Sequence, residues 1–193
     1  MLVFKKKTDL QEYLERENAS VGFVPTMGAL HNGHLSLLQK AKKDNEIIVC
    51  SIFVNPTQFN DKKDFEKYPI TLEADIHKII AIGTDILYLP DVAEIYPNGI
   101  SNLRQYPIGY LDTVLDGKFR PGHFNGVCAV VHQLLLAVQP TRLYLGEKDF
   151  QQCLVIQQLL QIIDSPVALI ICPTLREPNG LAMSSRNERL SKT

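Results

Sequence analysis

Two histidines that share a turn with a glycine are the first residues in this sequence whose types and spacing suggest chemistry. His31 and His34 stand three residues apart, with Gly33 between them, within the stretch 25–34. A glycine-bearing turn that leads into a helix offers backbone N–H groups and the positive end of the helix dipole to a phosphate. Two solvent-facing histidines beside a turn glycine are the simpler alternative. A zinc site is disfavoured because the helical ligand pair needs i, i+4 spacing and no third ligand is evident.

The same turn lacks the two best-known phosphate signatures. Gly28 and Gly33 have the G-x-x-x-x-G spacing of a P-loop, but His34 and Leu35 stand where a P-loop has Lys and Ser or Thr. The dinucleotide pattern G-x-G-x-x-G is also absent. The turn therefore predicts a phosphate site of a different kind.

Two further stretches carry phosphate-binding residue types. Residues 183–187, Met-Ser-Ser-Arg-Asn, combine two hydroxyls with a guanidinium, whose planar fork matches phosphate oxygens. Residues 146–149, Gly-Glu-Lys-Asp, follow an apolar run. Taken singly, the first could be an ordinary polar loop and the second a simple helix N-cap. Three such stretches, each directly after an expected strand, favour one common site.

The elements that must position these stretches alternate along the chain. A fold of βαβ units follows, because short apolar runs are separated by helical patterns of sufficient length. The expected class is α/β, a Rossmann-like parallel sheet with helices on both faces, in which ligands bind beyond the carboxyl ends of the strands. The expected strands are 21–24, 47–54, 86–89, 142–145 and 167–172. The expected helices are one starting with a capping box at Thr8 and Gln11, then 34–43, 71–82, 123–138 and 150–160, with a polar loop over 55–68 and an irregular region over 90–121 that includes a short hairpin.

Composition excludes several classes of protein. The chain has 193 residues and a formal net charge of −1, so it lacks the basic excess of a nucleic-acid-binding protein. The longest apolar run, 167–172, is far shorter than the roughly 20 residues of a membrane span, and the N-terminus does not match a secretory signal. Four cysteines without a C-x-x-C pair predict buried free thiols and a cytoplasmic location.

The histidine turn and the Met-Ser-Ser-Arg loop together resemble the nucleotidyltransferase superfamily that includes the class I aminoacyl-tRNA synthetases. Within it, four stretches resemble signatures of the pantothenate synthetase (pantoate–β-alanine ligase) family, in that family's order. A tRNA-charging fragment would explain only the first and last of them. The four stretches are 25–31, 53–59, 146–152 and 181–187.

The resemblance implies an ATP-dependent condensation of pantoate with β-alanine through a pantoyl-adenylate, with AMP and pyrophosphate released and Mg²⁺ required. It implies that His34 acts as an acid towards the phosphates, that Asp149 contacts the ribose and that Gln58 and Gln152 bind pantoate. Its implied ATP-binding residues are Met27, Gly28, Ala29, Leu30, His31, Asn32, Gly33, His34, Gly146, Glu147, Lys148, Asp149, Leu175, Met183, Ser184, Ser185 and Arg186. Its implied catalytic residues are His31, His34, Lys148, Ser184, Ser185 and Arg186.

Three other segments are ambiguous. Arg120 and His123 resemble a further family segment, which implies that they line the pocket, although helix capping explains them equally well. Asp75 is a candidate Mg²⁺ contact, but an exposed place on its helix is the default expectation. Ile70 stands where the family commonly has Arg, which puts any charge contact from that position in doubt.

The motif order also predicts the domain organisation. Residues 1–186 are expected to form the nucleotide-binding catalytic domain, and residues 187–193 the start of a C-terminal lid domain that this chain lacks. The family suggests a homodimer, with no nucleic-acid or membrane partner. Loss of the lid leaves an alternative function, a catalytically silent domain that binds nucleotide or dimerises.

Overall fold

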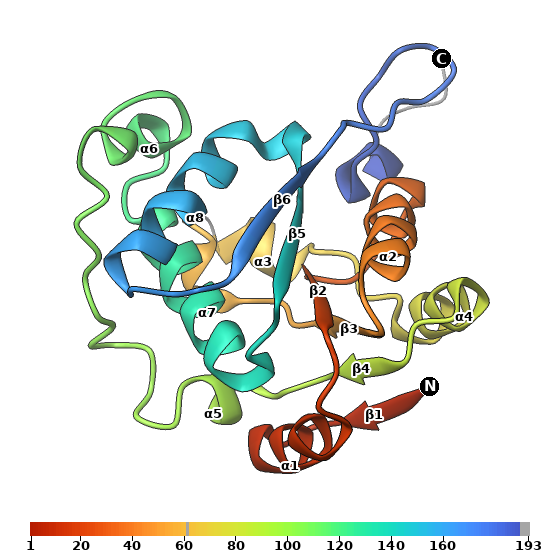
Figure 1. The fold of residues 1–193 in the computed structure, drawn as a ribbon. Helices are drawn as coiled ribbons and strands as arrows, with labels where there is room; N and C mark the ends of the chain where they lie inside the picture. The colour runs from red at the N-terminus through yellow and green to blue at the C-terminus, as the bar shows by residue number, and fades with distance from the viewer. Residues whose placement is uncertain (61, 190–193) are drawn as a thin grey trace.

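One parallel sheet organises the chain, as the computed structural model shows for residues 1–60 and 62–189 (Figure 1). Its strand order is β1-β4-β3-β2-β5-β6, and every pairing within it is parallel. The α/β class predicted from the sequence is therefore confirmed. The strands are β1 (Leu2–Phe4), β2 (Val21–Thr26), β3 (Ile47–Ile52), β4 (Ile86–Tyr88), β5 (Arg142–Gly146) and β6 (Ala168–Cys172).

The helices cover both faces of this sheet. The longer ones are α1 (Lys7–Glu17), α2 (Asn32–Asp44), α4 (Leu72–Ile82), α7 (His123–Val138) and α8 (Phe150–Ile162). Apolar residues of α1, α7 and α8 share one buried cluster with one face of the sheet, and those of α2 and α4 share a second cluster on the other face. Short helices are α3 (Lys62–Glu66), α5 (Val92–Ile95), α6 (Leu115–Phe119) and the 3₁₀ turns η1 (Pro56–Gln58), η2 (Gly109–Asp112), η3 (Glu147–Asp149) and η4 (Ser185–Arg189).

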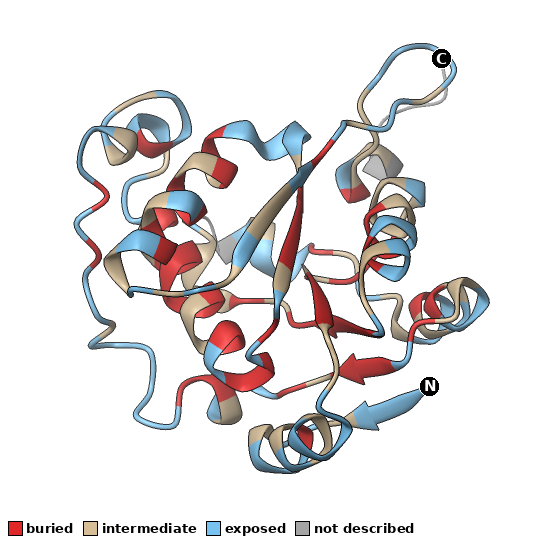
Figure 2. Cartoon of the chain, viewed as in Figure 1, coloured by how far each residue is buried: buried red, intermediate tan, exposed pale blue. Residues whose placement is uncertain are grey.

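The burial of the central strands explains why continuous apolar runs predicted them. All six residues of β3 are buried, and β2 is buried at all but one position, whereas Figure 2 shows the edge strand β1 mostly exposed. A parallel strand covered on both faces needs a continuous apolar run rather than an alternating one. The four cysteines are free and buried, as predicted. No helix among the described residues is long and apolar enough to span a bilayer.

The strand order places a switch point between β2 and β5. From β2 the chain proceeds outward through β3 to β4 on one side, and later from β5 to β6 on the other. At such a point the connections leave the sheet in opposite directions, which opens a crevice beyond the carboxyl ends of the strands. The crevice lies directly above the turns that follow β2 and β5.

Several local predictions were wrong. The first helix begins at Lys7, and the Thr8 hydroxyl bonds to Asp9 instead of forming a capping box with Gln11. The edge strand β1 was not predicted, because a mostly exposed strand of three residues has no apolar run long enough to indicate it. The stretch 55–68 contains η1 and α3 rather than only loop, and 90–121 holds α5, η2 and α6 with no strand, so the expected hairpin is absent there.

Candidate functional site

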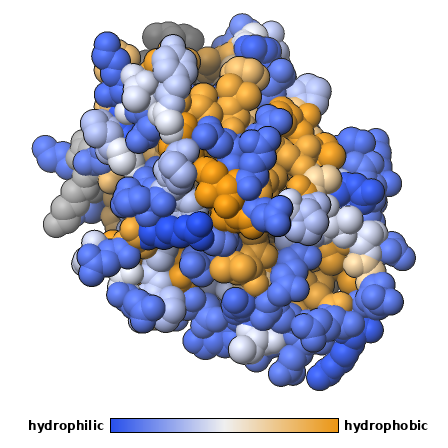
Figure 3. Space-filling model, turned by 60° about the vertical axis from the view of Figure 1, so that its left-hand side comes forward, coloured by the Kyte–Doolittle hydropathy of each residue, from blue (hydrophilic) through white to orange (hydrophobic). Residues whose placement is uncertain are grey.

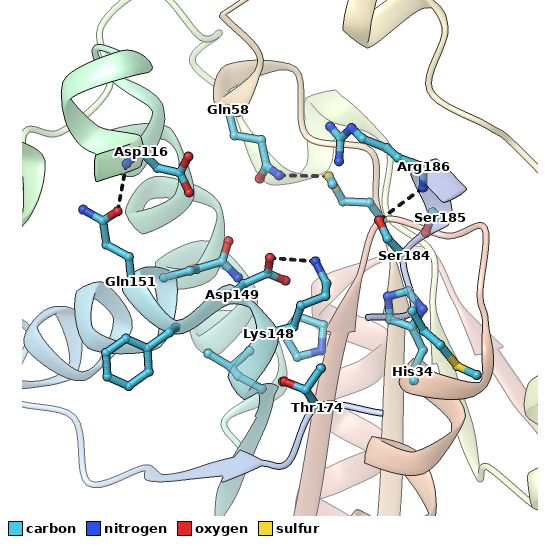
Figure 4. A pocket seen from close by; sticks show the side chains of 18 of the residues that line it. His34, Gln58, Asp116, Lys148, Asp149, Gln151, Thr174, Ser184, Ser185 and Arg186 are labelled. Carbon is cyan, nitrogen blue, oxygen red and sulfur yellow. Dashed lines mark hydrogen bonds and ion pairs between the residues drawn. The ribbon is translucent and has the colours of Figure 1, made fainter. Parts of the chain in front are cut away.

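A pocket of about 660 Å³ opens beyond the carboxyl ends of β2, β5 and β6. It brings together the three phosphate-type stretches that lie far apart in the sequence, and its walls are completed by residues of η1, α6 and the start of α7. In Figure 4 the side chains of His34, Ser184 and Arg186 lie on one side, Asp116 and Gln151 on the other, and Lys148 between them. The predicted site residues that line it are Met27, His31, Gly33, His34, Gln58, Gly146, Lys148, Asp149, Gln152, Leu175, Met183, Ser184, Ser185 and Arg186.

The two histidines cap α2 reciprocally. His31 is the N-cap, and its Nδ1 accepts a hydrogen bond from the N–H of Gly33 at 3.1 Å. The Nδ1 of His34 accepts from the N–H of His31 at 3.3 Å. Because a backbone N–H can only donate, both Nδ1 atoms carry a lone pair, and each neutral ring must hold its proton on Nε2. Each histidine therefore has one hydrogen-bond donor left, at Nε2.

The surroundings keep both rings neutral. Burial lowers the pKa of His34 to about 3, and the neighbouring His31, Lys148 and Lys78 contribute in the same direction. Burial, Lys148 and Lys78 also lower the pKa of His31. A neutral imidazole at pH 7 has no excess proton to give, so these rings suit a role as hydrogen-bond donors to an oxyanion. The acid role that the resemblance implied for His34 fits this arrangement poorly.

The turn that precedes the histidines does not present free N–H groups. The N–H groups of Ala29 and Leu30 donate to the carboxylate of Asp75, each at 2.8 Å, and that of Gly28 donates to the Thr26 hydroxyl at 3.2 Å. These three backbone N–H groups are therefore not free in this structure, and their contact with a phosphate stays a prediction. The predicted ATP-binding residues Gly28, Ala29, Leu30, Asn32 and Glu147 lie outside the pocket lining.

Asp75 was also misjudged. The default expectation placed it on the exposed face of α4, yet its relative exposure is 0%. Burial without hydrogen bonds would be costly for a carboxylate, and the two backbone N–H groups together with the Thr71 hydroxyl, at 3.2 Å, satisfy it. Periodicity alone could not reveal this, because the partner turn lies more than 40 residues away.

Lys148 supplies a cation at the centre of the pocket. It lies in η3, which follows β5 directly, and its Nζ is 2.9 Å from Oδ1 of Asp149. Both side chains line the pocket. The carboxylate of Asp149 orients the ammonium group. A phosphate, which is also an anionic acceptor, could replace Asp149 as the partner of Lys148.

The Ser184–Arg186 loop closes the pocket from a third direction. The Ser185 hydroxyl is buried and donates to the carbonyl of Ala29 at 2.9 Å, so it links this loop to the histidine turn. Nη2 of Arg186 lies 2.8 Å from Oδ2 of Asp64, and its guanidinium lies over the ring of Tyr68. Of the two serines, only Ser184 keeps its hydroxyl proton for a ligand, because its Oγ accepts from the N–H of Arg186.

Gln58 is held with a defined amide orientation. Nδ2 of the buried Asn55 donates to Oε1 of Gln58 at 3.1 Å, and Nε2 of Gln58 contacts the sulfur of Met27 at 2.9 Å. A thioether is a weak acceptor, so the Nε2 donors remain available to a better partner. The side chain of Gln58 thus offers N–H groups to the pocket.

Arg120 and His123, whose role the sequence left ambiguous, both line the pocket. Nδ1 of His123, the first residue of α7, lies 2.7 Å from the carbonyl oxygen of Gln58, and Nη2 of Arg120 donates to the same oxygen at 3.4 Å. A carbonyl only accepts, so His123 carries its proton on Nδ1 and leaves Nε2 as an acceptor. Burial lowers the pKa of His123, although the bond to Gln58 opposes the shift.

The neighbouring glutamines have different tasks. Gln152 lines the pocket as predicted. Gln151, which sequence reasoning missed, is buried and ties the 111–116 segment to α8. Its Oε1 accepts from the N–H of Asp116, and its Nε2 donates to the carbonyls of Leu111 and Val114. The segment it holds belongs to the irregular region, where no motif marked the lining residues Leu115, Asp116 and Phe119.

Large apolar side chains stand exposed beside the mouth of the pocket. Phe119 is 80% and Leu115 69% exposed on α6, and Phe150 is exposed at the start of α8. Figure 3 shows patches of apolar surface among hydrophilic side chains on the face of the molecule that points towards the viewer. The pocket itself thus combines polar donors with an apolar rim.

A resident metal centre does not fit the described residues. Among them no group of three or more His, Cys, Asp or Glu side chains is placed to hold a metal ion. Mg²⁺ commonly binds through substrate phosphates with only one or two protein carboxylates. The pocket carboxylates Asp116 and Asp149 could supply that smaller contribution.

Comparison with known proteins gives concordant results. The family model described as Pantoate-beta-alanine ligase matches residues 2–193. A pantothenate synthetase from Cytophaga hutchinsonii is 54% identical over 177 residues, which cover 92% of this chain and 62% of that relative. The chain therefore spans less than two thirds of the length of this curated relative.

Solved structures agree with these sequence relatives. The crystal structure of pantothenate synthetase from Thermus thermophilus superposes with a TM-score of 0.93 at 45% identity and covers 100% of this chain and 68% of that one. A pantoate-beta-alanine ligase from Francisella tularensis, complexed with beta-gamma ATP and beta-alanine, superposes with a TM-score of 0.95 at 44% identity and covers 100% and 74% of the two chains.

Proposed function

Because this chain belongs to the pantoate-beta-alanine ligase family, we propose that it joins pantoate to β-alanine with cleavage of ATP to AMP and pyrophosphate. The observation that carries the proposal is the convergence of donors in one pocket at the switch point of the sheet. Two neutral histidines, the ammonium of Lys148 and the guanidinium of Arg186 line the same cavity as the amides of Gln58 and Gln152. The cavity thus offers anion donors beside groups that suit a hydroxy acid.

The first chemical step is the activation of a carboxylate. The pantoate carboxylate attacks the α-phosphorus of ATP, pyrophosphate leaves, and a pantoyl-adenylate remains. During this displacement, negative charge develops on the phosphate oxygens. Preorganised hydrogen-bond donors stabilise that charge, and the step needs no nucleophile from the enzyme. We assign this task to four donors that line the pocket: the Nε2–H groups of His31 and His34, the Lys148 ammonium and the Arg186 guanidinium.

The second step is attack by the amine. The amino group of β-alanine attacks the acyl carbon of the adenylate, and AMP leaves. We assign the amides of Gln58 and Gln152 to pantoate, because an amide can bond to both hydroxyls and a carboxylate. The Nε2 group of Gln58 exchanges its weak contact with Met27 for this partner.

Mg²⁺ is part of the proposal as a companion of ATP. Its chemistry is to neutralise phosphate charge, and we expect the phosphates to provide most of its ligands. The remaining family features are also proposals: membership of the wider nucleotidyltransferase superfamily, a cytoplasmic location and a homodimer. The dimer is testable by sedimentation of this chain.

The domain assignment is likewise a proposal. We assign residues 1–186 to the nucleotide-binding catalytic domain, and residues 187–193 to the beginning of a lid domain. The turn η4 crosses this boundary, and residues 190–193 lie outside the described residues. The alternative function is a domain that binds ATP but does not turn it over, and the family match supports the ligase function over it.

One assay separates these functions. Pyrophosphate release from ATP should require pantoate, and amide product with AMP should require β-alanine as well. Pyrophosphate release that does not depend on pantoate would overturn the ligase assignment. Calorimetric binding of ATP without any turnover would instead support the silent domain.

A variant pair tests the role of the histidine turn. We expect His34→Ala to lower turnover on the order of a hundredfold, as for the loss of one oxyanion donor. His77→Ala is the matched control, because His77 is exposed on α4 and does not line the pocket. Equal turnover in the two variants would reject the role of His34.

A further inference from the structure

Asp75 is a buried ionisable residue that the proposed chemistry does not use. It projects from α4, and its relative exposure is 0%. Oδ2 accepts from the N–H of Ala29 and Oδ1 from the N–H of Leu30, both at 2.8 Å. The Thr71 hydroxyl donates to Oδ2 at 3.2 Å. Asp75 does not line the pocket, so its carboxylate contacts the protein and is not exposed to a ligand there.

The backbone that Asp75 contacts has an unusual conformation. Gly28 has φ +83° and Ala29 has φ +49°, both in the left-handed region. A turn of this kind directs successive N–H groups to one side and forms a concave nest for an anion. In many phosphate-binding loops such a nest holds the phosphate itself. Here the carboxylate of Asp75 fills it.

The carbonyl groups of the same two residues are also bound by side chains. The Ser185 hydroxyl donates to the carbonyl of Ala29, and Nζ of Lys78 donates to the carbonyl of Leu30. Every backbone polar group of Ala29 and Leu30 thus has a side-chain partner from α4 or from the Ser184–Arg186 loop. The strained turn is therefore held from outside rather than by its own backbone.

We propose that Asp75 is a positioning residue that acts as the built-in anion of this turn and thereby sets the orientation of His31 and His34. The histidines follow the turn directly, and His31 caps the helix in which His34 lies. A nest that is already occupied leaves phosphate recognition to side chains. The inference rests on the proposed function only for the identity of the ligand, because the geometry of the turn can be measured without one.

The variant Asp75→Asn tests the proposal in this chain. An amide keeps one acceptor oxygen but turns an NH₂ group towards a backbone N–H, so one of the two bonds is lost and the other is weakened because its acceptor is no longer charged. Hydrogen exchange at the amides of Ala29 and Leu30 should become at least about tenfold faster, as expected for losing a hydrogen bond to a charged group. The ¹⁵N signals of both histidine rings should change from the Nε2–H tautomer to a mixture, and ATP affinity should fall about tenfold.

Asp85→Asn is the matched control. Oδ2 of Asp85 also accepts a backbone N–H, that of Ile48 at 2.9 Å, at the amino end of the strands and away from the pocket. This variant should speed exchange at Ile48 and leave the histidine signals and the affinity for ATP unchanged. If Asp75 had only a structural role, the ¹⁵N signals of the His31 and His34 rings would be unchanged in both variants.

Unchanged exchange at Ala29 and Leu30 with unchanged ring signals in Asp75→Asn would overturn the proposal. Should that variant fail to fold, Thr71→Val replaces it, because it removes only the hydroxyl that supports Oδ2. A smaller acceleration of exchange at Ala29, accompanied by a shift of the His31 and His34 ring signals, would then support the proposal, and no change at either place would overturn it. The exchange and ring measurements need no substrate, so they stay decisive even if pantoate-dependent pyrophosphate release is not found.

Discussion

His31 and His34 cap the same helix, and a backbone N–H of the cap fixes the proton of each ring on Nε2. Their ring centroids lie 4.1 Å apart, and each Nδ1 accepts a backbone N–H, from Gly33 and from His31 respectively. The two rings are thereby held as paired Nε2–H donors. This arrangement requires both imidazoles to stay neutral, which has consequences for pH.

The free energy of unfolding should fall as the pH is lowered from 6.5 toward 3. Folding lowers the pKa of His34 from 6.5 to about 3, so within this window the unfolded chain binds a proton that the folded chain excludes. The loss should be about 1 kcal/mol per pH unit for this residue. Denaturant unfolding of the wild type and of His34→Asn at several pH values measures it, since asparagine can accept the same N–H but does not titrate. Parallel pH dependences would contradict the shift.

Lys148→Met should raise the pKa of both histidines. Lys148 lowers both values through its positive charge, and methionine keeps much of the side-chain volume without the charge. A ¹⁵N titration of the ring nitrogens follows each histidine separately. A pKa that stays in place or falls would show that Lys148 does not contribute.

Gly33→Ala should weaken ATP binding without lowering stability. A Cβ at this position would lie 2.8 Å from both Cε1 and Nδ1 of the His31 ring, so the ring must move and its hydrogen bond to Gly33 must break. Alanine is the better helix former by up to about 1 kcal/mol, which offsets the lost bond. Calorimetry with ATP and thermal unfolding measure the two effects.

Gln39→Ala provides the comparison for that variant, because Gln39 is exposed on the same helix. It should leave ATP affinity unchanged. If Gly33→Ala binds ATP as well as Gln39→Ala does, the position of the His31 ring is unimportant for binding.

Gly126→Ala should destabilise the protein by about 1–3 kcal/mol and weaken pantoate binding. The helix α7 packs so closely against η1 that a Cβ at Gly126 would lie 2.7 Å from the carbonyl carbon of Thr57. The obstacle is backbone, so no rotamer can relieve it, and η1 must shift together with Gln58. Leu136→Ala, on an exposed part of α7, should change stability less and leave pantoate binding intact. A stable Gly126→Ala protein with normal pantoate affinity would contradict the close approach.

Arg186→Lys should weaken ATP binding about tenfold, because lysine offers a single point of contact where arginine offers a planar fork. Arg176→Lys is the control from the same loop region, where Arg176 donates to the carbonyl of Gly180 and does not line the pocket. Calorimetric titration with ATP compares the two. Similar affinities would show that Arg186 contributes only charge.

Local pattern was sufficient for strands β2 to β6, for the long helices and for the order of the motifs. Strands β2 and β3 are buried on both faces and so had to be continuous apolar runs, and α7 begins and ends where its apolar periodicity predicted. The placement of the motifs after β2, β5 and β6 also followed, because parallel strands direct all their carboxyl ends to one edge.

The sequence by itself therefore determined the fold class and that the three loops after β2, β5 and β6 meet at the pocket, since both depend on local periodicity and strand direction. Only the tertiary structure decided which polar groups in those loops are free. Asp75 accepts the N–H groups of Ala29 and Leu30, Ser185 donates to the carbonyl of Ala29, and Arg120 and His123 contact the carbonyl of Gln58. Each of these contacts joins residues more than 40 positions apart, so its existence depends on how the helices pack across the sheet and not on any spacing along the chain.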